Sequence, residues 1–370
     1  MLYLGIDQHG KQLTICLRDE AGEVIQRRQV STQWERVRAF FDELRRQSIP
    51  AGGYLAIVEV CGFNDWLLEV LTEYGCRELV LIQTEKRSKK KTDRRDAHAL
   101  GEILWLNRQR LQAGQRLQGV RRVWIPSPDD QQDRQLTAMR RRVSWQRIRA
   151  LNQIQHLLRR HNLQWSIPTK TFDTLRTRKW LATLELGELD RLEMNLLLEA
   201  WTQWDRELEQ LESRLAERFA RSPAAQVLAT CRGLGAYGAL AIASRIGPID
   251  RFPRPRSLAN YWGLTPGCRN SGETTDRLGS ITKEGSALVR FILGQLVMHV
   301  LRHDAAMRAW FQRIRRRRGS KIARVAVMRR LATIFWHMLK HGESYVSGGP
   351  PRLRLRRDAA ATPPLAAGAS

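Results

Sequence analysis

Hydrophobic and polar positions alternate through the first thirty residues, and the period then changes. Segments 2–7, 11–17 and 23–30 have the alternation of strands, and a tight turn at Gly10 joins the first two. The apolar spacing that follows predicts a helix, a strand, a helix and a strand, in that order, over 33–47, 54–60, 64–74 and 78–83. Three antiparallel strands followed by alternating helix and strand predict an α/β domain with a mixed sheet.

The rest of the chain is predicted to be mainly helical. Basic helices follow the stretch 85–96 and extend to about residue 160. Two helices are expected within 227–245, around the hairpin Gly233-Leu234-Gly235, whose backbone N–H groups either hold a DNA phosphate or only form a tight turn. Further helices are expected from about 286 to 341. The basic run 313–318 is interpreted as a loop between them, facing phosphate or solvent.

Apolar residues between Trp180 and Phe219 recur in steps of three and four, with charged residues between them. The seam consists of Met194, Leu197, Trp201, Trp204, Leu208, Leu211 and Leu215. Such heptads predict either helical packing within one chain or a coiled coil between subunits. We favour the coiled coil between subunits, because few other features of the sequence would hold an oligomer together.

The balance of charge points to a polyanionic partner. Lys and Arg total 63 against 37 Asp and Glu, a net charge of +26 in 370 residues. Nucleic acid is the expected partner, with binding that weakens as salt is added. A membrane surface is the weaker alternative, since neither an amphipathic anchor nor a lipidation signal is present. Five scattered cysteines without CxxC spacing indicate reduced thiols, and no signal peptide pattern opens the chain. We therefore expect a cytoplasmic protein, associated with the nucleoid when active.

Four acids have the placement that a two-metal nuclease requires. Asp7 closes the first strand, and Glu59 lies near the end of the 54–60 strand. Asp93 and Asp96 lie three apart at the start of a helix, so they share one face. Oxygen ligands suit two Mg²⁺ ions, which can hold the attacking and leaving oxygens of a phosphodiester. The order of elements is also that of the RNase H fold, in which the strands bearing Asp7 and Glu59 are neighbours. Each acid taken singly also fits a turn or helix-cap role.

Basic residues surround both candidate sites. Those near the acids are Lys89, Lys90, Lys91 and Arg94. Those in the segment 261–293 are Arg269, Arg277, Lys283 and Arg290, and all eight are candidates for contacts with nucleic-acid phosphates. Ser271 lies in a small-residue loop of the same segment. A serine hydroxyl needs a base or a metal to become a nucleophile, and the residues alone do not distinguish Ser271 from Ser280, Thr282 or Ser286.

Several blocks of the sequence resemble one family of insertion-sequence transposases. These blocks are GIDQHGK with Asp7, VEVCGF with Glu59, KTDRRDAHAL with Asp93 and Asp96, and GLTP…SG…RLG…ITKEG, and the resemblance extends over about residues 1–345. Members of this family carry a RuvC-like DEDD domain and a second domain with a catalytic serine, and a structured bridge RNA guides them. Where the family usually has Val or Ile and then Ser after the first acid, this chain has Gln8 and His9.

The resemblance implies specific roles for these residues. The four acids would bind Mg²⁺, two ions being expected, and Ser271 would attack a DNA phosphate and form a transient phosphoserine link. Partners would be donor DNA, target DNA and a structured noncoding guide RNA. Dimers would pair into tetramers, so that the acids of one subunit and the serine of another complete a site.

The expected organisation is a RuvC-like α/β domain over 1–150, a helical coiled-coil linker over 151–222, a mainly helical serine-containing transposase domain over 223–347 and a disordered tail over 348–370. Two other functions stay open at this point. One is a structure-specific endonuclease resembling a Holliday-junction resolvase, with water as the nucleophile. The other is a nucleic-acid-binding protein with an inactive nuclease core.

Overall fold

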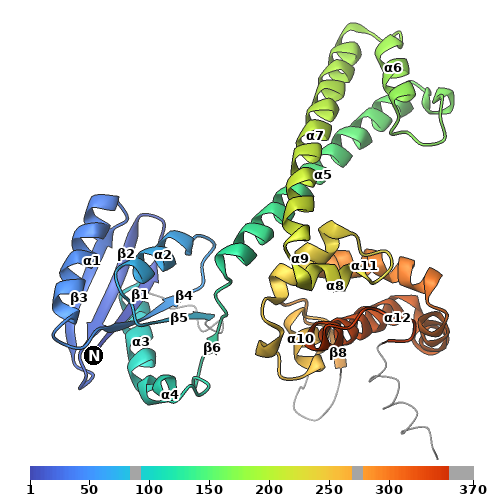
Figure 1. Cartoon of the computed structure of the whole chain (residues 1–370). Helices are drawn as coiled ribbons and strands as arrows, with labels where there is room; N and C mark the ends of the chain where they lie inside the picture. The colour runs from blue at the N-terminus through green and yellow to red at the C-terminus, as the bar shows by residue number, and fades with distance from the viewer. Residues whose placement is uncertain (84–92, 269–277, 350–370) are drawn as a thin grey trace, which may run out of the picture. The chain divides into compact units, whose positions relative to one another are not determined.

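The computed structural model describes residues 1–83, 93–268 and 278–349, and the chain divides into two compact units, Met1–Ile125 and Pro126–Ser370 (Figure 1). The expected boundary at residue 150 falls inside a single helix, α5 (Pro128–Arg160), which belongs to the second unit. The expected linker and the expected C-terminal domain also lie together in that unit. The division therefore comes earlier than predicted, because α5 continues without a break across residue 150.

The first unit contains the strands and helices that the hydrophobic pattern predicts, with a few additions. In chain order they are β1 (Leu2–Gln8), β2 (Gln12–Arg18), β3 (Val24–Ser31), α1 (Trp34–Ser48), β4 (Tyr54–Glu59), α2 (Asp65–Glu73), β5 (Glu78–Gln83), α3 (Asp93–Leu106), α4 (Arg108–Gln112) and β6 (Arg121–Arg122).

The six strands form one mixed sheet in the order β3-β2-β1-β4-β5-β6, in which β1, β4 and β5 run parallel. The mixed α/β sheet predicted from the sequence is confirmed. Apolar residues of α1 and α2 pack on one face of the sheet, with side chains such as Leu4 and Ile6. Leu100 and Leu104 of α3 pack on the other face with Tyr3 and Ile57. Both faces are covered, which explains why β1 is buried along its whole length.

The second unit is almost entirely helical, as predicted. Its elements are α5 (Pro128–Arg160), η1 (Gln164–Ser166), α6 (Leu175–Thr183), α7 (Glu188–Ala220), α8 (Pro223–Ala229), α9 (Ala236–Ile246), η2 (Ile249–Arg251), α10 (Pro255–Tyr261), β7 (Pro266–Cys268), β8 (Leu278–Ile281), α11 (Ala287–His303) and α12 (Ala305–His341). The predicted pair of helices around Gly233 and Gly235 is confirmed as α8 and α9.

Helices α5 and α7 form an antiparallel hairpin within the chain (Figure 1). Ion pairs mark its length, from Arg160–Asp190 at one end through Arg140–Glu212 to Arg218–Asp133 at the other. Of the predicted seam, Met194 and Trp201 are buried in a cluster with Ile154 and Leu157 of α5, and Leu215 joins the core beneath α8 and α9. The buried part of the seam thus packs inside one chain, the alternative that we did not favour. A contact between subunits along its half-buried remainder stays a prediction.

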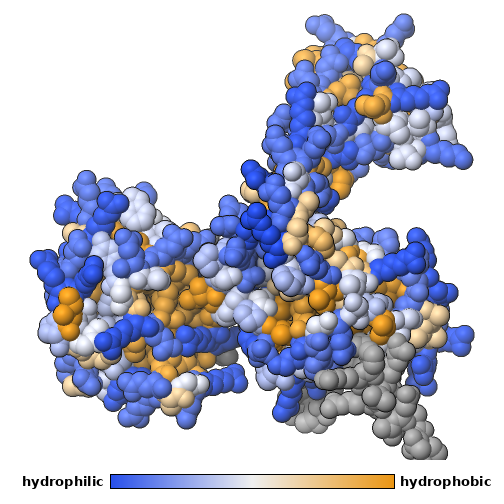
Figure 2. Space-filling model, viewed as in Figure 1, coloured by the Kyte–Doolittle hydropathy of each residue, from blue (hydrophilic) through white to orange (hydrophobic). Residues whose placement is uncertain are grey.

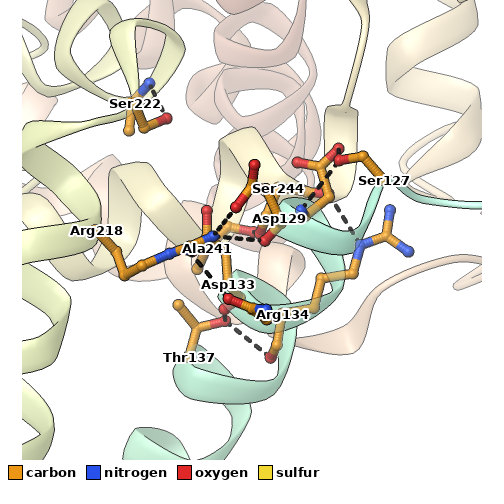
Figure 3. Close-up of polar contacts among 12 residues, drawn as sticks. Ser127, Asp129, Asp133, Arg134, Thr137, Arg218, Ser222, Ala241 and Ser244 are labelled. Atoms are coloured by element: carbon orange, nitrogen blue, oxygen red, sulfur yellow. Dashed lines mark hydrogen bonds and ion pairs between the residues drawn. The ribbon is translucent and has the colours of Figure 1, made fainter.

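Polar contacts fix the base of this hairpin to α9 (Figure 3). The Arg218 guanidinium donates to Asp133 at 2.6 Å and to Asp129 at 3.0 Å. Arg134 donates from Nε to the carbonyl of Ser244 at 2.9 Å, so α5 is connected to both α7 and α9. Asp133 is buried, and the paired guanidinium compensates for the loss of its hydration.

Helices α8 to α12 enclose the largest apolar cluster of the described residues, which includes Trp262, Leu293 and Phe335. The basic run 313–318 belongs to α12, so its assignment to a loop was wrong. Arginine has a high helix propensity, and exposed helical positions accommodate its charge. The non-helical residue of α12 is Gly319, at φ 80° and ψ 166°.

Gly348 and Gly349, which were predicted to begin a disordered tail, belong to the folded unit, and the rest of that predicted tail, 350–370, lies outside the described residues. Gly348 and Gly349 are buried, and the Gly348 N–H donates to the Asp304 carboxylate at 2.8 Å. Across the described ranges, no helix combines the length and the apolar character that crossing a bilayer requires.

Candidate functional site

Asp7 and Glu59 lie at matching positions on neighbouring strands. In the parallel pair formed by β1 and β4, Ile6 aligns with Val58, so the next residues along, Asp7 and Glu59, follow at the same end of the sheet. Asp7 is only 8% exposed, and Glu59 is half-buried as the last residue of β4. The prediction that the two acids occupy adjacent strands is confirmed.

The two acids also point to the same face of the sheet. Side chains alternate along a strand, so Asp7 shares a face with Gly5 and Tyr3, and Glu59 shares a face with Ile57. Tyr3 and Ile57 pack against α3, which identifies this face as the one that α3 covers.

Gly5 brings α3 against the sheet and sets its direction. A Cβ at Gly5 would lie 2.5 Å from the Ala97 carbonyl oxygen and 2.4 Å from the Gly101 nitrogen, a contact that only glycine permits. Trp105, near the C-terminal end of α3, donates to the carbonyl of Glu20, beyond the far ends of β1 and β2. The first turn of α3 therefore lies toward the end of β1 that carries Asp7.

Asp93 and Asp96 open this helix, as predicted. Asp96 is half-buried one residue before Ala97, which packs on Gly5. The side chain of Asp93 lies outside the described part of the structure. Among the described side chains alone, no three His, Cys, Asp or Glu groups are gathered closely enough to hold a metal ion. The fold thus brings the backbone positions of the acids to one end of one sheet face, while joint coordination of ions stays a prediction.

Three residues to which the sequence assigned no role, His9, Gln8 and Asn64, lie beside the first two acids. The His9 Nε2 atom lies 3.1 Å from the Asp7 Oδ2 atom. Gln8, at 6% exposure, donates to the Phe63 carbonyl at 3.0 Å and accepts from the Asn64 amide at 2.9 Å. The same Asn64 amide donates to the Glu59 carbonyl at 3.1 Å. These bonds join the ends of β1 and β4, so they hold the two strand-borne acids in register.

Close backbone contacts connect the stretches of chain on the two sides of the serine-containing segment. Ser271, Arg269 and Arg277 belong to the connection 269–277 between β7 and β8, which lies outside the described residues. On either side of it, Gly263 and Gly285 permit close backbone contacts. A Cβ at Gly263 would lie 2.3 Å from the Glu284 nitrogen, and one at Gly285 would lie 2.0 Å from the Tyr261 carbonyl oxygen. The WGLTP and ITKEG blocks, which flank the segment 267–280 in the sequence, are therefore in direct backbone contact.

The other residues that were predicted to contact phosphate differ in their structural settings. Arg290 donates to the carbonyls of Glu284, Gly285 and Trp262. It therefore has a structural role, because it connects the same two stretches of backbone. Lys283 is exposed and has a positive φ of 57°. Lys89, Lys90 and Lys91 lie outside the described residues, as does the side chain of Arg94. For all of these residues, contact with a phosphate stays a prediction.

Comparison with known proteins assigns the class. A model of the DEDD transposase domain of IS110 elements, described as a transposase, matches residues 4–163, and the model described as the IS116/IS110/IS902 transposase family matches residues 225–312. The first match contains the sheet and its acids, and the second contains the serine segment. The protein is a DNA transposase. It belongs to the IS110 family, as the resemblance of its motifs predicted.

Curated relatives agree with this assignment. The chain is 27% identical over 359 residues to the transposase for insertion sequence element IS1111A of Coxiella burnetii, covering 93% of this chain and 91% of that protein. It is 30% identical over 216 residues to the putative transposase y4qE of Sinorhizobium fredii, covering 58% of this chain and 49% of the relative.

Proposed function

We propose that this transposase performs RNA-guided DNA cleavage and strand transfer, with a Mg²⁺-dependent acidic site on a RuvC-like first unit and Ser271 as the nucleophile. The observation that carries the proposal is the common end and common face of Asp7, Glu59 and the first turn of α3. A shared position of acids contributed by two parallel strands and one helix is what an acidic nuclease site needs.

The donor set fits a hard divalent cation. Asp7, Glu59, Asp93 and Asp96 offer only carboxylate oxygens, the ligands that Mg²⁺ prefers, and two ions are expected. When bound, such ions supply positive charge to the phosphate and to the attacking and leaving oxygens. His9, beside Asp7, would keep that carboxylate oriented, and the bonds among Gln8, Asn64 and the Glu59 carbonyl would keep the strand ends together.

Ser271 supplies the covalent step in this proposal. Its Oγ forms a bond to phosphorus as the bond from phosphorus to a deoxyribose oxygen breaks, and the released oxygen takes up a proton. Rejoining reverses this with a hydroxyl of another strand. The assignment of Ser271 depends on the resemblance of the SG…RLG…ITKEG block and on its place in the sequence between the paired strands β7 and β8.

The partners follow from charge and resemblance. A net charge of +26 suits donor DNA, target DNA and a structured guide RNA. Base pairing by the RNA would choose the sequence, while basic helices hold phosphate backbones. Dimers that pair into tetramers would bring the acids of one subunit to the serine of another.

The test is a strand-transfer assay with the purified full chain, Mg²⁺, both DNAs and the noncoding RNA transcribed beside its reading frame. Wild type should give joined products and a covalent protein–DNA adduct. Asp7→Asn should abolish cleavage, whereas Asp42→Asn, an exposed acid on α1, should leave it unchanged. Ser271→Ala should abolish the adduct. Full cleavage by Ser271→Ala would instead show a water nucleophile, as in a junction-resolving endonuclease.

A further inference from the structure

One face of α5 carries large exposed apolar side chains among the basic and polar residues that a solvated helix normally presents. Ala138, Arg141, Arg142, Trp145, Ile148, Arg149 and Asn152 recur at steps of three and four, or adjacent to such a step, so they share this face. Trp145 is 62% exposed and Ile148 is 50% exposed. Figure 2 shows apolar patches among hydrophilic side chains along the α5–α7 hairpin. Large apolar side chains gathered on a surface mark an interaction site.

This face forms a groove whose other wall comes from α9 and α11. Its volume is about 710 Å³, and Arg245 of α9 and Leu288 of α11 line that wall. The Arg141 guanidinium lies 5.5 Å from the Trp145 ring centroid and 5.0 Å from that of Phe291 on α11. Arg141 therefore holds the Trp145 ring at the edge of the groove, with much of its surface open to a ligand.

The groove has a positive charge that its described partners do not neutralise. Arg245 donates to the hydroxyl of Thr137 and to the carbonyls of Ala241 and Arg134, all of them uncharged oxygens. Burial, with a smaller contribution from Arg134, lowers the pKa of Arg245 to about 10. It remains charged at neutral pH, and a phosphate in the groove would favour that charged form. Arg142 and Arg149 add exposed charge at the rim.

We propose that this groove binds an unpaired nucleotide of single-stranded RNA, with the base stacked on Trp145 and the adjoining phosphates held by Arg142, Arg149 and Arg245. The bases of duplex DNA are stacked inside the helix and do not reach such a ring, whereas RNA loops present unpaired bases. The exposed amides of Gln146 and Asn152, which also line the groove, can accept from a 2′-hydroxyl or bond to a base edge. The inference rests on the proposed function, which supplies the RNA partner.

Fluorescence anisotropy with a labelled, unstructured single-stranded RNA and the full chain tests this site. Trp145→Ala should weaken binding about tenfold through loss of one stacking contact, and Trp145→Phe should restore most of it. Trp165→Ala removes a tryptophan that is 85% exposed but lies outside the groove, so it should change nothing. A 5-bromouracil in the RNA should crosslink to a peptide of α5. Circular dichroism confirms that each variant is folded.

Three outcomes would overturn the inference. They are unchanged RNA affinity in Trp145→Ala, equal affinity for DNA of the same sequence, and a loss of subunit association in Trp145→Ala, which would assign the groove to a second copy of the chain. Failure of the proposed function can be distinguished from failure of the groove. If strand transfer needs no RNA while RNA binding still depends on Trp145, the guide role is wrong and the groove stands. If strand transfer needs RNA and Trp145→Ala binds RNA normally, only the groove is wrong.

Discussion

Gly5 lies where a strand of the sheet and α3 come into backbone contact, and its missing side chain is what allows that contact. In Gly5→Ala the new methyl would overlap the backbone of Ala97 and Gly101. We expect a loss of about 1–3 kcal/mol in the free energy of unfolding, together with weaker metal-dependent cleavage, because α3 must move away from Asp7. Urea unfolding and the cleavage assay measure the two effects.

Gly10→Ala is the matched control for this substitution. Nothing lies within 4 Å of a Cβ at Gly10, so its stability and cleavage should stay near wild type. Equal stability of the two variants would show that α3 does not approach the sheet as described.

The sequence predicted the strand-borne acids well and their neighbours poorly. Asp7 and Glu59 close strands whose alternation is visible in the sequence, and parallel pairing then places them side by side. Gln8 and Asn64 bond across 56 positions of the chain, and no local pattern carries that information. The one available signal was the presence of amides directly beside two acidic motifs.

At the scale of elements, α12 contains one glycine whose backbone conformation other residues adopt only with strain. Gly319 has φ 80° and ψ 166°, a region that is almost exclusive to glycine, and nothing lies within 4 Å of a Cβ there. Gly319→Ala should therefore cost about 1–3 kcal/mol from backbone strain alone. Gly294→Ala, at an exposed helical position of α11, should instead stabilise by about 0.5–1 kcal/mol. Thermal unfolding of both variants separates the two signs, and a stabilised Gly319→Ala would contradict the non-helical conformation described for Gly319.

The start of α12 makes stability sensitive to acid. Burial would raise the pKa of Asp304, but hydrogen bonds from the N–H groups of Gly348 and Met307 and the hydroxyls of Tyr345 and Ser347 lower it below its ordinary 3.8. A lowered carboxyl pKa contributes stability that is present above the ordinary value and is lost as pH falls through the folded value. Asp304→Asn should cost about 1–3 kcal/mol at pH 7, since the amide cannot accept all of these bonds.

The acid dependence gives this prediction its check. In urea unfolding, the difference between wild type and Asp304→Asn should shrink as pH falls below 4. Asp250→Asn, a control at an exposed acid paired with Lys340, should show a much smaller difference at every pH. A pH-independent difference in Asp304→Asn would show that the carboxylate charge is not what stabilises this end of the helix.

The hydrophobic period of a sequence identifies the apolar face of a helix, but it does not identify the element that packs on that face. The seam of α7 was visible in the sequence, yet its buried members pack on α5 of the same chain, because a heptad fits any apolar partner helix. The arginines at 315–318 were wrongly predicted to lie in a loop for a related reason. A charged run has no hydrophobic period, so it was interpreted as a loop although arginine favours helices.

For the whole molecule, net charge governs how nucleic acid binding responds to salt. A net charge of +26 predicts that log Kd for DNA rises linearly and steeply with log salt, as counterions are released from phosphates. Arg316 and Arg317 are exposed on α12, and neutralising either to Gln should reduce the slope by about one if it contacts a phosphate. Titrations at several salt concentrations measure the slope. A flat salt response of the wild-type chain would remove the electrostatic basis for binding.

The bonding of Asp304 bears on how this transposase can be fused to other proteins. Three of its four donors come from Tyr345, Ser347 and Gly348, close to the last described residue, Gly349. An affinity tag or fluorescent partner attached after Gly349 would leave those donors in place. Trimming back to His341 for a shorter expression product would remove these three donors and leave the Asp304 carboxylate with only the Met307 N–H, so such products should be less stable than the chain that ends at Gly349.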